Sequence, residues 1–303
     1  MIEDLESLNK QCKEGFELGE RIKIKKPENI LVCGMGGSGI TGNFLEEMDL
    51  NIPVIVNKSD KIPRFVSKNT LVFCVSYSGN TRETISCYKK SKKRGANIVV
   101  ITSGGKLGKM TKKNLIKIPS GFVPRAAFGY LFFSILGVLE KSGLMKISKE
   151  VKEIEKLNSG YFNKRGKELS KLFYKKMPLV YSNSHAVAYR WKTGLNENSK
   201  TLCLASTSTE IFHNEIEGYN NLNTKPFAII LDIDGKVNSK LKKILRKKQI
   251  GFKEIGFNGK LIGRMKGLWL SDFTSYYLGL KYKENPEETK MIDWFKKNSR
   301  YNL

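Results

Sequence analysis

Two short loops rich in glycine and hydroxyl side chains each follow directly after an apolar run. The first loop has the sequence CGMGGSGITG at residues 33–42, and the second has SYSGNTRET at residues 76–84. Glycine lets the backbone approach an anion closely, and the free N–H groups at the start of a helix favour negative charge. One glycine and four hydroxyl residues are the candidate phosphate ligands: Gly37, Ser38, Ser76, Ser78 and Thr81. Together the two loops predict a pocket for a phosphate ester.

Other phosphate-binding motifs match these loops less well. A dinucleotide fold needs an acidic residue about 20 positions after its glycines, but Asp49 comes too early and Asp60 lies beyond a strand that contains proline. Neither loop ends in Gly-Lys-Ser/Thr, so a nucleoside triphosphate loop is not indicated. Hydroxyl groups without a lysine suit a small phosphate monoester. The alternative is that both loops are only tight connections between a strand and a helix.

The elements that would position these loops alternate between strand and helix. Strand-like apolar runs, separated by helical stretches, are expected at residues 30–33, 53–57, 70–75, 97–102 and 115–118. After lysine-rich helical sequence at 141–176, a second series is expected at 179–182, 201–205, 227–232 and 252–256. This order predicts an α/β fold with two doubly wound parallel sheets, in domains of residues 1–150 and 151–303. The second series has no comparable glycine loop, although Tyr181-Ser182-Asn183-Ser184 lies at an equivalent strand end.

The composition is that of an enzyme-sized protein. The chain has 303 residues, enough for one large domain or two ordinary ones. Its five cysteines form no CxxC pair and are odd in number, so the sequence predicts neither a zinc site nor a disulfide framework. The N-terminal MIEDLESLNK is unlike a signal peptide, and the longest apolar stretch, residues 126–139, is too short to span a bilayer. We therefore expect a cytoplasmic protein with a buried helix at 126–139 and no membrane contact.

The net charge of +25 raises the question of nucleic-acid binding, because clustered Lys and Arg neutralise a phosphate backbone. The lysines are instead dispersed over most of the expected helices, as at Lys89, Lys92 and Lys112, and the two glycine-rich loops contain none. Dispersed lysines indicate a solvated surface, and a positive protein attracts small anionic substrates. We therefore expect a small anionic ligand and no nucleic-acid partner.

Five motifs occur in an order and spacing that resemble a known family. They are GMGGSGITG, SYSGNTRET, VPRAAFGY, LNENSK and FHNEIEG, and the resemblance covers nearly the whole chain. In this combination the sequence resembles the archaeal-type bifunctional phosphoglucose/phosphomannose isomerases. The resemblance implies two flavodoxin-like sugar isomerase (SIS) domains, the first with the phosphate loops and the second with the catalytic base and the last helix. It also implies interconversion of fructose 6-phosphate with glucose 6-phosphate and mannose 6-phosphate.

Aldose–ketose isomerisation determines which chemical groups such a site needs. The sugar ring must open, and a proton must then move between C1 and C2 through an enediol. The reaction requires a carboxylate base, a cation beside the enediolate oxygen, and an acid/base pair for ring opening. It requires no metal and no redox cofactor, so we expect neither.

The resemblance assigns these roles to particular residues. Glu197 in LNENSK matches the base, and Arg125 in VPRAAFGY matches the arginine that stabilises the enediolate. His213 in FHNEIEG matches a ring-opening histidine that reaches the site from the neighbouring subunit, which implies a homodimer. From residue types alone, Glu215 and Glu217 remain rival bases. Residue type alone also allows Glu197 and Arg125 to face solvent, and His213 to be structural.

The C-terminal segment NPEETKMIDWFK at residues 285–296 resembles the last helix of the same family. Lys296 aligns with a lysine that assists ring opening, and Lys297 is the adjacent alternative. Thr289 matches a position linked to acceptance of the mannose epimer, because a small side chain there leaves room around C2. Glu287 and Glu288 depart from the more apolar, proline-bearing pattern expected at these positions.

A regulatory protein that binds hexose phosphates without converting them is the alternative interpretation. Such a sensor needs the hydroxyl loops, but it has no use for a base and a cation that act only on an enediolate. Glu197 and Arg125 therefore favour the enzyme.

Overall fold

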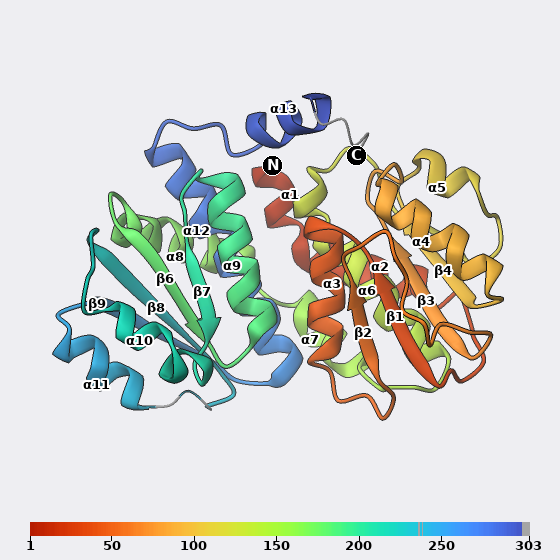
Figure 1. Ribbon diagram of the computed structural model, residues 1–303, viewed down its shortest axis with the longest axis horizontal. Coiled ribbons are helices and arrows are strands. Elements are labelled where there is room, and N and C mark those ends of the chain that lie inside the picture. Colours follow the sequence, from red (N-terminus) through yellow and green to blue (C-terminus); the bar gives the residue numbers. More distant parts are fainter. Residues whose placement is uncertain (236, 238, 299–303) are drawn as a thin grey trace.

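The computed structural model describes residues 1–235, 237 and 239–298. In this part of the chain the strands form two parallel sheets, and helices flank each of them (Figure 1). Ile30 and Val32 of the first sheet enter an apolar core that the two sheets share, whereas Leu31 enters a separate outer core. Likewise Val180 of the second sheet enters the shared core and Leu179 enters an outer one. The two units are therefore joined through one common core.

Both sheets have the doubly wound order. The first sheet has the order β2-β1-β3-β4-β5, with β1 (Asn29–Cys33), β2 (Val54–Asn57), β3 (Thr70–Val75), β4 (Asn97–Thr102) and β5 (Leu115–Lys117). The second has the order β7-β6-β8-β9, with β6 (Met177–Ser182), β7 (Leu204–Thr207), β8 (Pro226–Ile233) and β9 (Gly251–Phe257). In each sheet the chain starts at an inner strand and adds strands on both sides, as in flavodoxin-like folds. The predicted fold class is confirmed.

One predicted strand is displaced. The run expected at 201–205 forms β7 at Leu204–Thr207 instead. Lys200 has a φ of 52°, in the left-handed region, and the N–H of Thr201 donates to the carbonyl oxygen of Leu195 at 3.2 Å. The chain is still turning away from the preceding helix here, and Leu202 is 82% exposed. The prediction was wrong because an exposed leucine in a turn resembles a strand residue in the sequence.

The helices follow the expected alternation. Those before residue 142 are α1 (Ile2–Glu6), α2 (Leu8–Gly19), α3 (Gly36–Glu46), α4 (Arg82–Lys93), α5 (Gly105–Lys109), the 3-10 turn η1 (Pro124–Ala126) and α6 (Phe128–Lys141). Those after it are α7 (Ser148–Glu155), α8 (Ser159–Phe173), α9 (His185–Asn198), η2 (Glu210–His213), α10 (Glu215–Gly218), α11 (Ser239–Lys247), α12 (Lys260–Lys281) and α13 (Lys290–Asn298). None of the helices in the described part of the chain is long and apolar enough to cross a membrane.

The buried helix expected at 126–139 is α6, which η1 precedes. Every residue from Phe128 to Leu139 is buried. α2 packs against α6 so closely that a Cβ on Gly137 would lie 2.1 Å from the carbonyl oxygen of Phe16. Since only glycine fits at this contact, Gly137 determines how α6, and η1 at its amino end, lie against α2.

α3 of the first unit and α9 of the second face each other between the two sheets (Figure 1). Ser184, directly before α9, donates from its Oγ to Glu47 Oε2 at the end of α3, at 2.5 Å. The two helices therefore run antiparallel, and the end of α9 lies beside the start of α3. This arrangement brings the LNENSK motif of the second unit to the first glycine-rich loop.

The boundary predicted between residues 150 and 151 lies within α7. α7 packs against α2 on one side and against α12 on the other. The division into domains of residues 1–150 and 151–303 stays a prediction.

Candidate active site

The two glycine-rich loops lie side by side at the carboxyl ends of β1 and β3. These strands are parallel neighbours, with Cys33 opposite Cys74, and β2 lies on the other side of β1. The loops therefore occupy the point where the chain winds in opposite directions, which is where doubly wound sheets bind ligands. α3 and α4 begin here, so both helices present free N–H groups to the same space.

Hydrogen bonds leave two hydroxyl protons of these loops unused. The backbone N–H of Tyr77 donates to Ser38 Oγ at 3.3 Å, which joins the two loops. The backbone N–H of Asn80 donates to Ser78 Oγ at 3.2 Å. Within the described structure Ser38 and Ser78 accept hydrogen bonds through Oγ but donate none. Both hydroxyl protons are therefore available to a phosphate oxygen.

Ser76 and Thr81 hold the second loop in shape. Ser76 is 1% exposed, and its Oγ lies 3.0 Å from Thr81 Oγ1. Ser76 Oγ also accepts the N–H of Gly79 at 3.1 Å. Gly79 has a φ of 66°, and a Cβ there would lie 1.9 Å from the carbonyl oxygen of Gly104. The glycine of the SYSGNT motif is thus required by the backbone.

The first loop lies directly against the segment that carries Arg125. A Cβ on Gly37 would lie 3.2 Å from the Cα of Arg125, so a larger residue at position 37 would displace this segment. The second loop contacts the same segment, since the N–H of Phe122 donates to the hydroxyl oxygen of Tyr77 at 2.7 Å. Both glycine-rich loops are therefore in contact with the segment that forms η1.

Replacing both Ser38 and Ser78 with alanine is expected to raise the KM for a phosphate-ester substrate about a hundredfold or more. Each hydrogen bond to a charged group contributes about 1.5–3 kcal/mol, and about 1.4 kcal/mol is a factor of ten in binding. Steady-state kinetics would show the change in KM with a smaller change in kcat. Ser120→Ala is the matched control because Ser120 is exposed and lies outside the loops. An unchanged KM in the double variant would remove both serines from the phosphate site.

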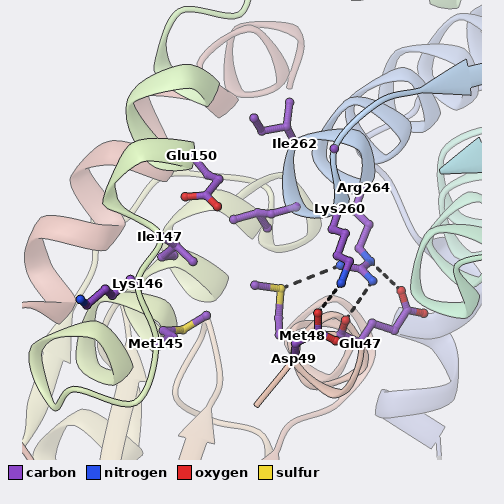
Figure 2. Close-up of a pocket in the computed structure, with 12 residues that line it drawn as sticks. Glu47, Met48, Asp49, Met145, Lys146, Ile147, Glu150, Lys260, Ile262 and Arg264 are labelled. Carbon is purple, nitrogen blue, oxygen red and sulfur yellow. Dashed lines mark hydrogen bonds and ion pairs between the residues drawn. The ribbon is translucent and has the colours of Figure 1, made fainter. Parts of the chain in front are cut away.

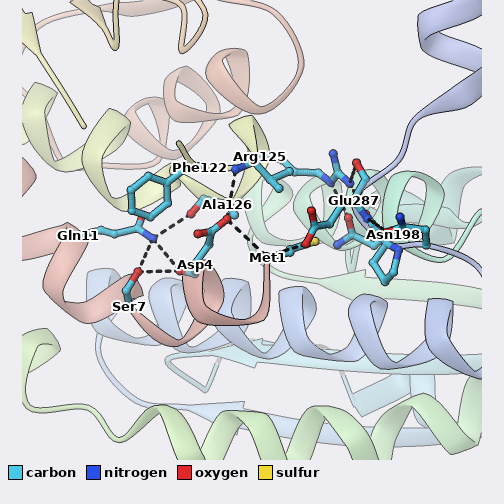
Figure 3. A network of polar contacts seen from close by, with 12 residues as sticks. Met1, Asp4, Ser7, Gln11, Phe122, Arg125, Ala126, Asn198 and Glu287 are labelled. Carbon is cyan, nitrogen blue, oxygen red and sulfur yellow. Dashed lines mark hydrogen bonds and ion pairs between the residues drawn. The ribbon is translucent and has the colours of Figure 1, made fainter. Parts of the chain in front are cut away.

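Arg125 is 8% exposed and is fixed along one edge of its guanidinium. Its Nε donates to Asn198 Oδ1 at 2.5 Å, and its Nη2 donates to the carbonyl oxygens of Pro286 and Glu287, the latter at 3.2 Å. Figure 3 shows Arg125 pointing toward Asn198, with Glu287 alongside. Nη1 makes no hydrogen bond within the described structure and lies 3.7 Å from Glu197 Oε2. The unused edge of the arginine therefore faces the predicted base.

Two side chains from the first helices hold the backbone on either side of Arg125. The N–H of Val123 donates to Asp4 Oδ2 at 3.2 Å, and Gln11 Nε2 donates to the carbonyl oxygen of Ala126 at 3.0 Å. Gln11 Nε2 also donates to the carbonyl oxygen of Asp4 at 2.8 Å, so these contacts form one network (Figure 3). This network positions η1 before any ligand binds.

Glu197 lies in the last turn of α9 and reaches the first unit through its contact with Arg125. Its side chain is 26% exposed, so the carboxylate is accessible to a ligand. Burial lowers the pKa of Arg125, and the negative charge of Glu197 acts in the opposite direction. The guanidinium stays charged at any working pH. The pair thus combines a carboxylate that can accept a proton with a fixed cation that can stabilise an enediolate.

His213 does not lie near this pair within one chain. Glu197 precedes β7 and His213 follows it, so the two residues lie at opposite ends of that strand. Glu215 and Glu217 belong to α10, directly after His213, and burial raises the pKa of Glu215. His213 is exposed, and its place in the site stays a prediction that requires a second subunit.

Thr289 lies two residues after Glu287, which binds Arg125, whereas Lys296 lies farther along the chain in α13. Every described residue of α13 is exposed, including Lys296 and Lys297, and Trp294 is 59% exposed. In the described part of the chain, no hydrogen bond or ion pair joins Lys296 to Glu197. The roles of Thr289 and Lys296 stay predictions.

Asn198 and Lys200 contact the candidate site residues, and these contacts were not predicted from the sequence. Lys200 Nζ donates to the carbonyl oxygens of Glu197 at 3.0 Å, Asn285 at 2.6 Å and Glu288 at 2.9 Å. This lysine ties the end of α9 to the C-terminal segment. Both residues lie in the LNENSK motif next to Glu197, and that proximity is the sequence signal that could have identified them.

In the second unit, the segment after β6 corresponds to the glycine-rich loop after β1. This segment binds the carboxylate of Glu47. Glu47 Oε1 accepts the N–H of Ala186 at 2.7 Å, and its Oε2 accepts from Ser184 Oγ at 2.5 Å and from Arg264 Nε at 2.9 Å. Asp232, near the end of neighbouring β8, adds negative charge. The contact borders a cavity of about 400 Å³ in which Glu47 and Arg264 point toward each other (Figure 2). The segment that ends in Ser184 thus joins the two units through Glu47.

Glu47→Ala is expected to destabilise the protein by about 2 kcal/mol, because it leaves Arg264 without its carboxylate partner and removes the acceptor of the Ala186 N–H at the start of α9. A urea titration would show this as a lower unfolding midpoint. Glu46→Ala is the matched control, since Glu46 is exposed and makes only one hydrogen bond in the described structure, with Asn43 at 3.4 Å. Equal midpoints for the two variants would show that the Glu47 contact does not hold the units together.

Three of the five cysteines, Cys33, Cys74 and Cys87, lie together in the outer core of the first unit. Within the described part of the chain, no group of three or more His, Cys, Asp or Glu side chains could hold a metal ion. All five cysteines are buried, free thiols.

Two family models match the chain, one on each unit. Residues 23–120 match the SIS domain, and residues 162–298 match the bacterial phospho-glucose isomerase C-terminal SIS domain. A hypothetical protein from Thermus thermophilus shares the fold, with a TM-score of 0.74 and 14% identity over 100% of this chain and 90% of that one. Fold and matches together define a protein with two SIS domains.

Its relatives identify the family within this class. The bifunctional phosphoglucose/phosphomannose isomerases of Caldicellulosiruptor bescii and Aquifex aeolicus are each 34% identical to it, over 98% and 93% of both chains respectively. A D-glucosamine-6-phosphate 4-epimerase from Sulfolobus acidocaldarius is 32% identical over 71% of this chain and 72% of its own. The chain belongs to the bifunctional phosphoglucose/phosphomannose isomerase family.

Proposed function

We propose that this protein is an aldose–ketose isomerase that interconverts fructose 6-phosphate with glucose 6-phosphate and mannose 6-phosphate. The observation that carries the proposal is the position of Glu197, 3.7 Å from Arg125, whose segment contacts the two glycine-rich loops. Membership of the bifunctional isomerase family supports the same activity.

The phosphate serves as a remote handle, and the chemistry takes place at C1 and C2. Ser38, Ser78 and the starts of α3 and α4 bind the phosphate. In open-chain fructose 6-phosphate, Glu197 takes a proton from C1 while Arg125 Nη1 stabilises the negative charge that develops on the C2 oxygen. Glu197 then returns the proton to C2, and a proton passes from the C1 oxygen to the C2 oxygen, which gives the aldose. Protonation of C2 on opposite faces gives the two epimers.

Ring opening needs groups beyond this pair. We assign it to His213 of the partner subunit together with Lys296, and Thr289 leaves room for the mannose epimer at C2. This assignment makes the active form a homodimer. The exposed position of His213 after β7 supports the assignment, because such a residue can be donated to another subunit. The chemistry itself needs neither a metal ion nor a redox cofactor.

We further propose that the protein acts in the cytoplasm on hexose 6-phosphates, without a nucleic-acid or membrane partner. Its lysines are dispersed over the helices, and the cysteines are buried, free thiols. Both features suit an enzyme of small anionic metabolites in a reducing compartment.

Purified protein should convert fructose 6-phosphate into both aldose phosphates and leave glucosamine 6-phosphate unchanged. NMR time courses with each sugar phosphate alone would measure this. Conversion of glucosamine 6-phosphate only would assign the activity of the epimerase relative instead. Tight binding of fructose 6-phosphate without turnover would indicate a regulatory sensor.

A further inference from the structure

We propose that Asn198 is a positioning residue that aims Arg125 at the substrate, and that Ser275 on α12 fixes the orientation of its amide. The proposal rests on the proposed function, because it gives Arg125 an enediolate to stabilise. Asn198 is 1% exposed and Arg125 is 8% exposed, so water cannot replace either residue in their hydrogen bond. The geometry that sets the guanidinium direction therefore lies wholly within the protein.

The amide of Asn198 can adopt only one orientation between its two neighbours. Its Oδ1 accepts from Arg125 Nε at 2.5 Å, and its Nδ2 donates to Ser275 Oγ at 2.9 Å. Ser275 Oγ gives its single proton to the carbonyl oxygen of Asp272 at 3.1 Å, so toward Asn198 it can only accept. Arginine nitrogens only donate, so a flipped amide would place two donors together on one side. The oxygen of Asn198 must therefore face Arg125.

The same region of α12 also holds the backbone of Arg125. Arg190 Nη2 donates to the carbonyl oxygen of Arg125 at 2.7 Å and lies 2.7 Å from Asp272 Oδ1. Arg190 and Asp272 are each 3% exposed. Asp272 and Ser275 thus lie on one side of α12, and each acts on Arg125 through a residue of α9. Asp272 holds the main chain of Arg125 through Arg190, and Ser275 holds its side chain through Asn198. Both contacts exist before a ligand arrives, as a preorganised electrostatic site requires.

These contacts determine which edge of the Arg125 guanidinium faces the substrate. Asn198 Oδ1 accepts the hydrogen bond of Arg125 Nε, and the carbonyl oxygens of Pro286 and Glu287 accept those of Nη2. The edge that remains is Nη1, which faces Glu197. Loss of the Asn198 contact would let the guanidinium rotate, so the distance between its free edge and the enediolate oxygen would change while the phosphate loops stayed intact.

The test compares two serines on the same helix. Ser271 lies one turn before Ser275, is equally buried, and its Oγ has no hydrogen-bond partner in the described structure. Ser275→Ala removes the acceptor that orients Asn198, whereas Ser271→Ala removes the same atom without breaking a hydrogen bond. Loss of a direct oxyanion donor costs about 10²–10³-fold, so we expect an indirect loss of about tenfold in kcat for Ser275→Ala, with KM nearly unchanged. Ser271→Ala should retain wild-type kcat and KM.

Asn198→Asp supplies the complementary variant. It preserves size but places a second carboxylate against Arg125, which draws the positive charge away from the substrate. It should lower kcat at least as much as Ser275→Ala, again with little change in KM. If this variant does not fold, Ser275→Ala still decides the question, because it removes only one oxygen atom.

Hydrogen exchange of the Arg125 Nε proton, followed by NMR in the ligand-free protein, gives a readout that needs no turnover. We expect faster exchange in Ser275→Ala and an unchanged rate in Ser271→Ala. Equal kcat and equal exchange in the two serine variants would overturn the proposal. Absence of isomerase activity in the wild-type protein would instead overturn the proposed function, and the exchange comparison would still report on the Asn198 contact.

Discussion

Glu197→Gln is expected to lower kcat for fructose 6-phosphate by about 10³-fold, within the range that general base catalysis contributes. The amide keeps the size of the side chain but cannot accept the C1 proton at working pH. The phosphate loops are untouched, so substrate binding should persist. Exchange of the transferred sugar proton with D₂O, followed by NMR, should disappear together with turnover.

The control for this prediction comes from the two other candidate carboxylates. Glu215→Gln and Glu217→Gln should retain proton exchange, because both residues belong to α10 at the far end of β7. Fluorescence or calorimetric titration with fructose 6-phosphate would confirm that each variant still binds. Persistent exchange in Glu197→Gln, with loss of exchange in one of the α10 variants, would show that Glu197 is not the base.

Arg125→Met is expected to have the second largest effect, a loss of about 10²–10³-fold in kcat/KM. Methionine keeps the length of the side chain but provides no charge for the C2 oxygen. An anionic analogue of the enediolate should lose more affinity than fructose 6-phosphate does, because the arginine acts mainly on charge that develops during the reaction. Inhibition constants for the analogue, compared with the dissociation constant of the substrate, would measure this difference.

Two further variants separate charge from geometry at this position. Arg125→Lys keeps the positive charge, but one ammonium group cannot contact Asn198, the carbonyl oxygen of Glu287 and the substrate at once. We expect an intermediate loss in kcat/KM. Arg165→Met is the control, because Arg165 lies on the surface and pairs with Glu168 at 2.9 Å, away from the site. Equal loss of affinity for substrate and analogue in Arg125→Met would contradict the enediolate role.

The sheets could be predicted because their strands are continuous apolar runs with both faces buried. All residues of β3 are buried, for example, and such runs are typical of parallel sheets covered by helices. β7 could not be placed correctly, because it lies at the edge of its sheet and carries exposed Leu204 beside the equally apolar but non-strand Leu202. An edge strand with solvent on one side has a weaker apolar pattern.

The position of the two glycine-rich loops between a strand and a helix could also be predicted, since glycine and hydroxyl residues after a strand act locally. Their binding of phosphate stays a prediction. The contact between Arg125 and Glu197 required more, because it depends on α3 and α9 running antiparallel between the two sheets. The sequence offered those two residues only through family resemblance. Asn198, Ser275 and Arg190 were not predicted because their hydrogen bonds join three elements that only the folded core brings together.

The central claim is that the Glu197–Arg125 pair moves a proton between C1 and C2 without distinguishing the two faces of C2 completely. Incubating the wild-type protein with fructose 6-phosphate in D₂O, without added metal, and following the products by NMR tests this most directly. We expect glucose 6-phosphate and mannose 6-phosphate, with deuterium at C2 in the fraction of turnovers in which the proton held by Glu197 exchanges with D₂O before it is returned. Glucose 6-phosphate alone would retain the isomerase but contradict the role of Thr289. Binding of fructose 6-phosphate without any product would contradict the proposed enediol mechanism.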